Sequence, residues 1–360
     1  MIALLRSTDG NPDSRFEKYV NFLDSESIPY MTICWDRYNV KIPTVNQLFY
    51  KKESKYGLRL KNMTGLLGFN WFLLKSLIKR RKEYKVIHAA DFDTVLPAMI
   101  MKLIYGKKVI YDIYDWYIDS RSINNSFFKC IIMQIERINV KKSDAVIICE
   151  EGRKKQIIFE PKQLWVLPNI PSLSIPANRY APKNNITVSY VGILGDGRGL
   201  LNIIRLAHEK PDVNFIVGGF GPLEKEFVEA NKMPNFNFKG RVSYEEALKI
   251  MSSSDLIYAM YERVNPNHIL AAPNKYYEGL ALGRPVITTT GTLVGDKVEK
   301  YGTGYCIDEK YESLFNLFGS LNREEIATKC KKASEIWESK YSNYISQFMG
   351  NIYLKFIQQA

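Results

Sequence analysis

Apolar, β-branched runs alternate with amphipathic stretches along most of this chain. In the first half the runs occupy residues 2–7, 30–35, 85–90, 107–114, 145–150 and 164–169. Stretches with helical spacing lie between them, near 13–25, 65–82, 94–105, 126–142 and 151–158. Such alternation predicts a parallel sheet with helices on both faces. The near-continuous apolar character of the runs fits strands that are buried on both sides.

The same alternation restarts after a break rich in proline and asparagine. Pro168, Pro171, Pro176 and Pro182 fall close together there, which is typical of a linker. The later runs are 186–194, 214–219, 235–240, 255–260, 284–289 and 302–307, with helical stretches near 199–210, 222–231, 244–253, 274–282 and 310–319. We therefore predict two doubly wound α/β domains, 1–170 and 186–335, joined by a linker at 171–185. Ligands of such folds bind where strands end at a crevice.

Composition narrows the classes of partner. The chain has 360 residues, and 50 Lys and Arg against 38 Asp and Glu give a net charge of +12. This charge favours an anionic partner, which can be a nucleic acid, an anionic membrane or a phosphate-bearing small molecule; surplus lysine that only aids solubility is the plain alternative. The five cysteines form no C-x-x-C pair, which argues against disulfides and zinc and fits a reducing cytosol.

No targeting or membrane-spanning segment is expected. The apolar start of the chain is too short for a signal peptide. No run approaches the ~18–20 apolar residues that cross a bilayer. We expect a cytoplasmic protein that is soluble or peripheral on the membrane.

A glycine-rich turn follows the run at 186–194. Gly192, Gly195, Gly197 and Gly199 lie in it, with Arg198 among them. Glycine lets the backbone approach a ligand closely, and the N-terminus of the following helix favours an anion. The turn favours phosphate binding slightly over an ordinary strand-to-helix connection. It matches neither a P-loop nor a strict G-x-G-x-x-G.

Two further turns could line the same crevice. Gly218, Gly219 and Gly221 end the run at 214–219. Gly240, Arg241 and Val242 follow the next run, where a nucleobase could lie against the backbone. Plain turns explain either motif about as well.

A charged pair lies in the short helix predicted at 274–282. Lys275 and Glu278 are three residues apart and share one helical face, and Gly283 ends the helix. A carboxylate at this place could accept hydrogen bonds from ribose hydroxyls. The alternative is a surface ion pair, worth a few tenths of a kcal/mol.

Polar residues also follow the strands of the first half. His88 closes the run at 85–90, Asp91 and Asp93 follow it, and Asp112 and Asp115 end the run at 107–114. Strand ends are where a doubly wound domain keeps its site. A buried edge histidine and capping carboxylates are the competing interpretation.

In their order, these motifs resemble the GT-B glycosyltransferases, in particular the large retaining group that includes bacterial capsule and O-antigen enzymes. The resemblance covers most of the chain and rests on YVGILGDGRGL, FIVGGFGP, FKGRVSYEEALKIMSSSDLIY and NKYYEGLALGRPVITT. It implies two Rossmann-like domains facing a cleft, with a C-terminal helix at 336–360 that crosses back to the N-terminal domain. It also implies sugar transfer from a nucleotide sugar, for which we expect a UDP-sugar.

The resemblance implies roles for individual residues. Gly10, Gly195 and Arg198 would contact the donor diphosphate, and His88 would lie near the transferred sugar. The positions that would hold the nucleobase and ribose are Gly219, Gly240, Arg241, Val242 and Glu278.

Two positions depart from the family pattern. Leu270 stands where the family often has a first glutamate, and Ile193 stands where it often has an arginine. Lys275 could supply the missing cation to the diphosphate. The sugar would then meet the loop 262–273, with Asn265, Asn267 and His268 offered to it; with His88, the last two are the candidate catalytic residues.

The remaining expectations concern metal, acceptor and membrane. Asp91-Phe92-Asp93 has metal-motif spacing but lies in the acceptor-side domain, so we expect no metal and no other cofactor. The acceptor would be a glycan or an undecaprenyl-diphosphate-linked glycan. The basic, aromatic stretch 65–85 could lie on an anionic membrane, or be a core helix with a solvated basic end. No nucleic-acid motif accompanies it.

Two other classes of function remain open from the sequence. A sugar-nucleotide epimerase can use the same fold, although it would need carboxylates around the sugar, which Leu270 argues against. A non-catalytic nucleotide-binding or nucleic-acid-binding protein would explain the charge and the glycine turns.

Overall fold

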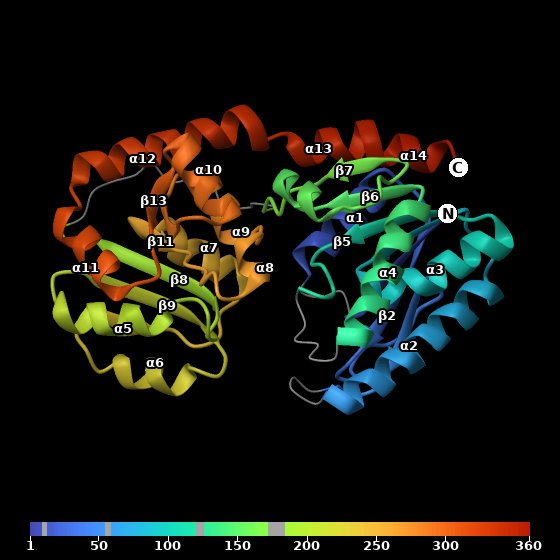
Figure 1. Cartoon of the computed structure of the whole chain (residues 1–360), viewed down its shortest axis with the longest axis horizontal. Coiled ribbons are helices and arrows are strands. Elements are labelled where there is room, and N and C mark those ends of the chain that lie inside the picture. The colour runs from blue at the N-terminus through green and yellow to red at the C-terminus, as the bar shows by residue number, and fades with distance from the viewer. Residues whose placement is uncertain (9–12, 55–58, 120–125, 172–183) are drawn as a thin grey trace. The chain divides into compact units, whose positions relative to one another are not determined.

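The computed structural model describes residues 1–8, 13–54, 59–119, 126–171 and 184–360. The chain divides into two compact units, and each is drawn in Figure 1. The N-terminal unit consists of Met1–Pro168 and Ser346–Ala360, and the C-terminal unit of Asn169–Ile345. Most of the predicted linker, 172–183, lies outside the described residues.

The N-terminal unit is built on a seven-stranded sheet in the order β3-β2-β1-β4-β5-β6-β7, and every pairing is parallel. Its strands are β1 (Ile2–Arg6), β2 (Tyr30–Asp36), β3 (Gln47–Lys51), β4 (Val86–Ala90), β5 (Lys108–Ile113), β6 (Ala145–Ile148) and β7 (Leu164–Val166). The strand order reverses between β1 and β4. At this point the carboxyl ends of β1, β4 and β5 come together, as in other doubly wound folds.

Four α-helices and one 3₁₀ helix connect these strands. They are α1 (Ser14–Ser25), α2 (Arg59–Lys79), α3 (Phe92–Tyr105), α4 (Ser126–Lys142) and the 3₁₀ helix Glu151–Gln156. Local sequence sets their ends: the Asp13 side chain accepts from the Phe16 amide at the start of α1, and Gly106 adopts the left-handed conformation after α3. The core between the helices and the sheet contains Trp35, Phe69 and Tyr111.

The C-terminal unit is built on a six-stranded sheet in the order β10-β9-β8-β11-β12-β13, again all parallel. Its strands are β8 (Thr187–Ile193), β9 (Asn214–Phe220), β10 (Phe236–Phe238), β11 (Leu256–Tyr258), β12 (Val286–Thr289) and β13 (Gly304–Ile307). Its helices are α5 (Leu200–Glu209), α6 (Glu224–Ala230), α7 (Tyr244–Ser252), α8 (Pro266–Ile269), α9 (Asn274–Leu282), α10 (Leu293–Tyr301), α11 (Tyr311–Ser320) and α12 (Arg323–Ile336).

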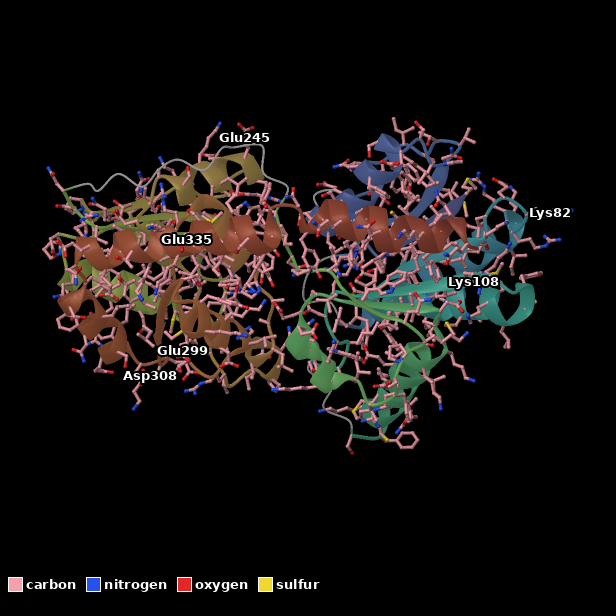
Figure 2. The ribbon with its side chains drawn as sticks, turned by 90° about the horizontal axis from the view of Figure 1, so that it is seen from above. Lys82, Lys108, Glu245, Glu299, Asp308 and Glu335 are labelled. Carbon is pink, nitrogen blue, oxygen red and sulfur yellow. The ribbon has the colours of Figure 1, made fainter. Side chains whose placement is uncertain are left out.

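The predicted class, two doubly wound parallel-sheet units, is confirmed, and every strand predicted from an apolar run is present. The prediction missed β3, α8 and α10. The edge strand β3 has an apolar run of only three residues, 48–50, which is half-buried, and both of its ends are exposed. Charged side chains such as Lys82, Lys108, Glu245 and Glu299 lie on the exposed surface of their units (Figure 2).

The end of the chain rejoins the N-terminal unit through α13 (Tyr344–Phe348), the π-helical turn Met349–Tyr353 and α14 (Leu354–Gln358). Tyr353 is fully buried, and its hydroxyl lies 2.9 Å from Nδ1 of His88. Its ring also packs against Tyr19, with ring centroids 5.1 Å apart. This contact fixes the terminal segment on the unit that contains β4 and α1.

Tyr353→Phe is expected to lower the free energy of unfolding of this unit by about 1–2 kcal/mol, because a buried ring nitrogen of His88 loses its partner while the packing stays. Urea denaturation measures the change. Tyr38→Phe is the matched control, since Tyr38 is 72% exposed and its hydroxyl reaches solvent. Equal stability of the two variants would show that the His88–Tyr353 contact contributes nothing.

Candidate functional site

Three glycine turns meet at the carboxyl end of the C-terminal sheet. The amide of Gly219 donates to the carbonyl of Gly240 at 2.7 Å. Gly219 has φ +154°, and a Cβ there would lie 1.9 Å from the carbonyl oxygen of Gly192. Val242 packs over Gly218, where a Cβ would lie 3.0 Å from Cγ2 of Val242. The ends of β8 and β9, where Gly192 and Gly219 are paired, and the loop after β10 therefore form one surface lined by backbone.

Lys275 reaches this surface from the first turn of α9. A Cβ on Gly192 would lie 2.9 Å from Nζ of Lys275, so the ammonium group covers that glycine. Nζ also lies 4.7 Å from the ring centroid of Tyr190. Burial lowers the pKa of Lys275 to about 8, Arg198 adds to the effect, and Glu278 opposes it. The lysine is therefore poised to lose its proton just above neutral pH.

Arg198 lies on the other side of the same turn. Its guanidinium is 5.4 Å from the ring centroid of Tyr261, and it hydrogen-bonds to the hydroxyls of Tyr190 and Tyr261. The hydroxyl of Tyr190 in turn donates to the carbonyl of Ile193 at 2.7 Å. Tyrosines thus hold Arg198 near Lys275. Within the described part of the chain, neither cation forms an ion pair with a carboxylate.

Glu262 ties the loop after β11 to the glycine turn. Its amide donates to the carbonyl of Gly197 at 2.8 Å, and its Oε1 accepts from the amide of Gly199 at 3.1 Å, at the start of α5. Its carbonyl lies 3.1 Å from Nδ1 of His268. A carbonyl only accepts, so Nδ1 carries the proton and Nε2 of a neutral His268 is an acceptor.

His268 lies against the glycine turn, since a Cβ on Gly197 would be 2.9 Å from its Cε1. Burial lowers the pKa of His268 below its ordinary value, and the nearby Arg198 acts in the same direction. The ring is therefore neutral at pH 7. Asn267 is the second residue of the same short helix, α8, and its amide donates to the Asn265 side chain at 3.0 Å. Leu270 caps the end of α8 and is half-buried.

Glu278 is buried in the middle of α9, with an exposed fraction of 5%. It hydrogen-bonds to the hydroxyl of Tyr244 at the start of α7, which raises the pKa of that tyrosine together with burial, the larger cause. Arg241 stacks over Phe220, with 4.5 Å from its guanidinium carbon to the ring centroid. Arg241 thus lies against the end of β9, and Glu278 lies between the start of α7 and Lys275.

The structure assembles most of the predicted donor-site residues in the C-terminal unit. Contacts link Gly219, Gly240, Val242, Arg198, Lys275, Glu278 and His268 to one another or to the same turn. Gly195 lies in that turn, its amide bonded to the Ile193 carbonyl. Gly10 lies outside the described residues. The roles assigned to all these residues stay predictions.

His88 is fully buried in the N-terminal unit. Its Nε2 lies 3.4 Å from Oδ2 of Asp112, and its ring packs edge-on against Tyr19 with centroids 4.3 Å apart. With Tyr353 at Nδ1, both nitrogens face protein groups. The competing interpretation of a buried structural histidine describes this environment. A catalytic role for His88 would require exposure of the ring, and it stays a prediction.

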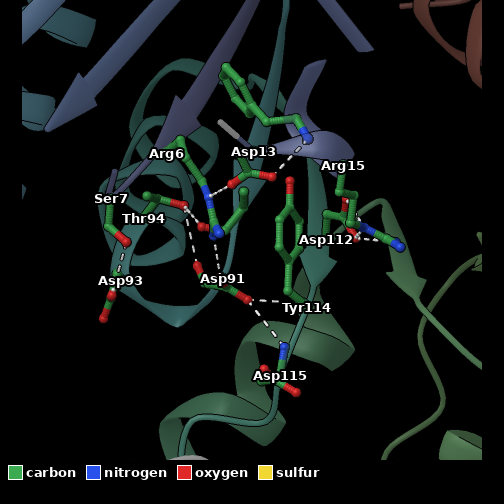
Figure 3. A network of polar contacts seen from close by, with 12 residues as sticks. Arg6, Ser7, Asp13, Arg15, Asp91, Asp93, Thr94, Asp112, Tyr114 and Asp115 are labelled. Carbon is green, nitrogen blue, oxygen red and sulfur yellow. Dashed lines mark hydrogen bonds and ion pairs between the residues drawn. The ribbon is translucent and has the colours of Figure 1, made fainter. Parts of the chain in front are cut away.

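A polar network lies at the carboxyl ends of β1, β4 and β5 (Figure 3). Arg6 forms ion pairs with Asp13 and Asp91, and its guanidinium lies 4.1 Å from the ring centroid of Tyr114. Asp91 accepts the Tyr114 amide at 2.9 Å. Asp91 has φ 65° and ψ 167°, a conformation that costs a non-glycine residue about 1–3 kcal/mol and clusters at functional sites.

Burial raises the pKa of Asp91 to about 6, against the lowering effect of Arg6. The nearby Asp93 accepts the Ser7 hydroxyl at 3.1 Å. The two carboxylates therefore accept from Arg6 of β1, from Ser7 just after it and from the Tyr114 amide just after β5. Over the described residues, no group of three or more metal-binding side chains is found.

Comparisons with known protein families and structures show what this chain is similar to. Residues 190–321 match the family of glycosyl transferases group 1. No curated protein sequence matches the chain. The matched segment contains the glycine turns, α8 and α9.

Solved structures resemble the whole chain. Sucrose-phosphate synthase from Thermosynechococcus elongatus is 13% identical, with a TM-score of 0.73 over all of both chains. HepE from Anabaena, solved with UDP-glucose, is 13% identical, with a TM-score of 0.68 over 98% of this chain and 100% of that one. WaaG, a glycosyltransferase involved in lipopolysaccharide biosynthesis, is 13% identical, with a TM-score of 0.65 over 95% and 96%. These likenesses show that the chain has the GT-B fold.

Sequence reasoning missed the residues that hold the predicted ones. Tyr190, Tyr244 and Tyr261 position Arg198 and Glu278, and Glu262 anchors the loop after β11. Tyr190 and Tyr261 occur in or beside apolar runs that already had an explanation as core. A hydroxyl at the end of a buried strand is the one signal that could have found them.

Proposed function

We propose that this chain is a glycosyltransferase that moves a sugar from a nucleoside diphosphate sugar, most simply a UDP-sugar, to a glycan or lipid-linked glycan acceptor in bacterial surface polysaccharide synthesis. The observation that carries the proposal is the pair of Lys275 and Arg198. Two like charges are held close enough for one to lower the pKa of the other. Glu278 offsets part of this repulsion, and an anion bound at the two cations would relieve the rest.

A diphosphate fits that requirement. As the glycosidic bond of a nucleotide sugar breaks, negative charge grows on the leaving phosphate oxygens. Fixed cations and backbone amides stabilise that charge without reorganisation. Lys275 over Gly192 and Arg198 beside Gly197 are placed for this task.

The other groups have roles that follow from their chemistry. Glu278, buried beside Tyr244, would accept hydrogen bonds from the ribose hydroxyls. The loop Gly240–Val242 would hold the base. His268 and Asn267 would face the hexose, with the neutral Nε2 of His268 accepting from a sugar hydroxyl. Two cations at the diphosphate are consistent with a reaction that needs no metal, and we propose that the sugar is transferred with retention.

A thermal-shift experiment with UDP, GDP and ADP tests the donor class. We expect UDP to raise the melting temperature most, since a ligand that binds only the folded state stabilises it in proportion to the logarithm of its concentration over its Kd. No shift with any nucleotide would overturn the proposal.

Incubation with UDP-sugars and no acceptor separates the alternatives. A transferase is expected to release UDP slowly, whereas an epimerase would return an epimerised nucleotide sugar. Once an acceptor is found, the anomeric configuration of the product, read by NMR, tests retention.

A further inference from the structure

Three neighbouring helices cover one face of the N-terminal sheet. α2 packs against α3, and α3 packs against α4 (Figure 1). Their inner sides enter the core through residues such as Leu73 of α2, Val95 of α3 and Val140 of α4. None of the helices in the described residues combines the length and apolar character of a membrane span. The question is therefore what the outer sides of these helices, which do not enter the core, contact.

The outer side of α3 is apolar. Leu96, Ile100, Leu103 and Ile104 are exposed, at a spacing that places them on one helical face. Leu103 is 87% exposed and Ile104 is 61% exposed. Single exposed leucines need no explanation, but a stripe along a whole helix does.

The two flanking helices extend the stripe. On α2, Leu67 and Trp71 are exposed one turn apart. On α4, the exposed apolar residues are Phe127, Phe128, Ile131 and Ile138. Phe127 and Ile131 are also one turn apart. Apolar and aromatic side chains thus project from all three helices.

The exposed charges on these helices are positive. The only acidic residues in their sequences are Asp93 and Glu136, and both are buried. Lys75, Lys79, Lys129, Lys141 and Lys142 are exposed. Nζ of Lys75 lies 5.2 Å from the ring centroid of Trp71. The outward surface of the three helices therefore combines apolar side chains with lysines and carries no exposed carboxylate of its own.

We infer that the outer face of α2, α3 and α4 docks the protein on an anionic membrane surface. Apolar and aromatic side chains enter the boundary between headgroups and acyl chains, and lysines attract anionic lipids. A second copy of this chain fits less well, because a two-fold interface would place like charges against each other. A nucleic acid would use the lysines but leave the apolar stripe exposed to water.

This inference keeps Trp71, Lys75 and Lys79 of the stretch 65–85 that the sequence suggested, but not its two arginines, and it adds the faces of α3 and α4. Arg80 donates to the carbonyl of Val45 at 2.7 Å and pairs with Glu83. Arg81 donates to the carbonyl of Ile78 at 3.1 Å. Those two arginines bind protein acceptors, whereas the apolar side chains of α3 and α4 project into solvent.

Vesicle co-sedimentation tests the inference. The full chain is incubated with vesicles of phosphatidylcholine and phosphatidylglycerol, and separately with phosphatidylcholine alone. We expect binding to the mixed vesicles that weakens with added salt. L103Q/I104Q and F127S/F128S are each expected to reduce the partition coefficient about tenfold. K129Q/K141Q/K142Q is expected to reduce it about a hundredfold on the mixed vesicles.

L201Q/V228Q is the matched control, because it removes two exposed apolar side chains from α5 and α6 of the other unit. It is expected to bind vesicles as the wild type does. Far-UV circular dichroism and melting temperatures show that each variant is folded. Vesicle binding requires neither donor nor acceptor, so its failure would leave the proposed sugar transfer untouched.

Two outcomes would overturn the inference. One is wild-type binding that L103Q/I104Q and F127S/F128S leave unchanged. The other is no vesicle binding together with a concentration-dependent dimer in light scattering that the same variants abolish, which would assign the face to a second copy of the chain.

Discussion

Lys275→Met is expected to weaken the binding of UDP-glucose about 10- to 100-fold at pH 7, with the fold unchanged. A hydrogen bond to a charged group contributes about 1.5–3 kcal/mol, and every 1.4 kcal/mol is a factor of ten in affinity. Methionine keeps the length of the stem that packs near Tyr190 but removes the positive charge over Gly192. Isothermal titration calorimetry measures the loss.

The pH dependence of binding separates a charge effect from a packing effect. Burial and Arg198 lower the pKa of Lys275 to about 8 in the free protein. The lysine is charged below this pH, so affinity for a diphosphate is full there and falls as the pH rises through and above 8. UDP-glucose has no group on its diphosphate that titrates in this range. Lys275→Arg should keep the affinity and remove its dependence on pH between 7 and ~9, since arginine stays protonated.

Lys249→Met is the control for Lys275→Met. Lys249 lies on the exposed side of α7 and forms an ion pair with Glu245 at 2.7 Å. No role at the glycine turns is proposed for it. It is expected to bind UDP-glucose as the wild type does. If Lys275→Met also binds normally, Lys275 is not a diphosphate ligand, and the idea that it replaces the cation missing at Ile193 is wrong.

The sequence was sufficient to predict the two sheets, because most of their strands are buried on both faces. A run such as Ala145–Ile148 has no polar residue and is flanked by helical spacing, so length and composition identify it. The edge strand Gln47–Lys51 has exposed ends, and its apolar run of three residues is only half-buried. Edge strands obey a weaker pattern because only part of their surface is covered.

The candidate site was predictable where backbone chemistry defines it and not where distant side chains do. Glycines at strand ends identify places where a side chain would not fit: Gly192 and Gly219 are partners in the β8–β9 ladder, and a Cβ on Gly219 would lie 1.9 Å from the carbonyl oxygen of Gly192. The contact of Glu262 with Gly199 joins residues 63 positions apart, and that of His88 with Tyr353 joins residues 265 positions apart. No local pattern contains such pairs. The environment of His88 could therefore not be predicted from nearby residues, because it depends on the C-terminal segment packing against the N-terminal unit.

Asp112→Asn is expected to lower the free energy of unfolding of the N-terminal unit by about 3–5 kcal/mol, which is the cost of leaving a buried charge without its partner. Nη2 of Arg15 lies 2.8 Å from Oδ1 of Asp112, and the two side chains are 4% and 0% exposed. Tyr19 also donates to Asp112, at 2.7 Å. Asparagine fits the same space but cannot neutralise Arg15. Chemical denaturation followed by circular dichroism measures the loss.

The pH dependence of the unfolding free energy gives a second test of this prediction. Burial opposes ionisation of Asp112, but Arg15 and His88 outweigh it and hold the pKa of the carboxyl below its ordinary value of 3.8. The stabilisation is therefore complete above about pH 4 and is lost as the pH falls below that, so wild type and Asp112→Asn should converge in stability on acidification. Glu245→Gln, which breaks an exposed pair, should cost only a few tenths of a kcal/mol. A loss for Asp112→Asn as small as that of Glu245→Gln would mean that solvent reaches Arg15 and compensates its charge.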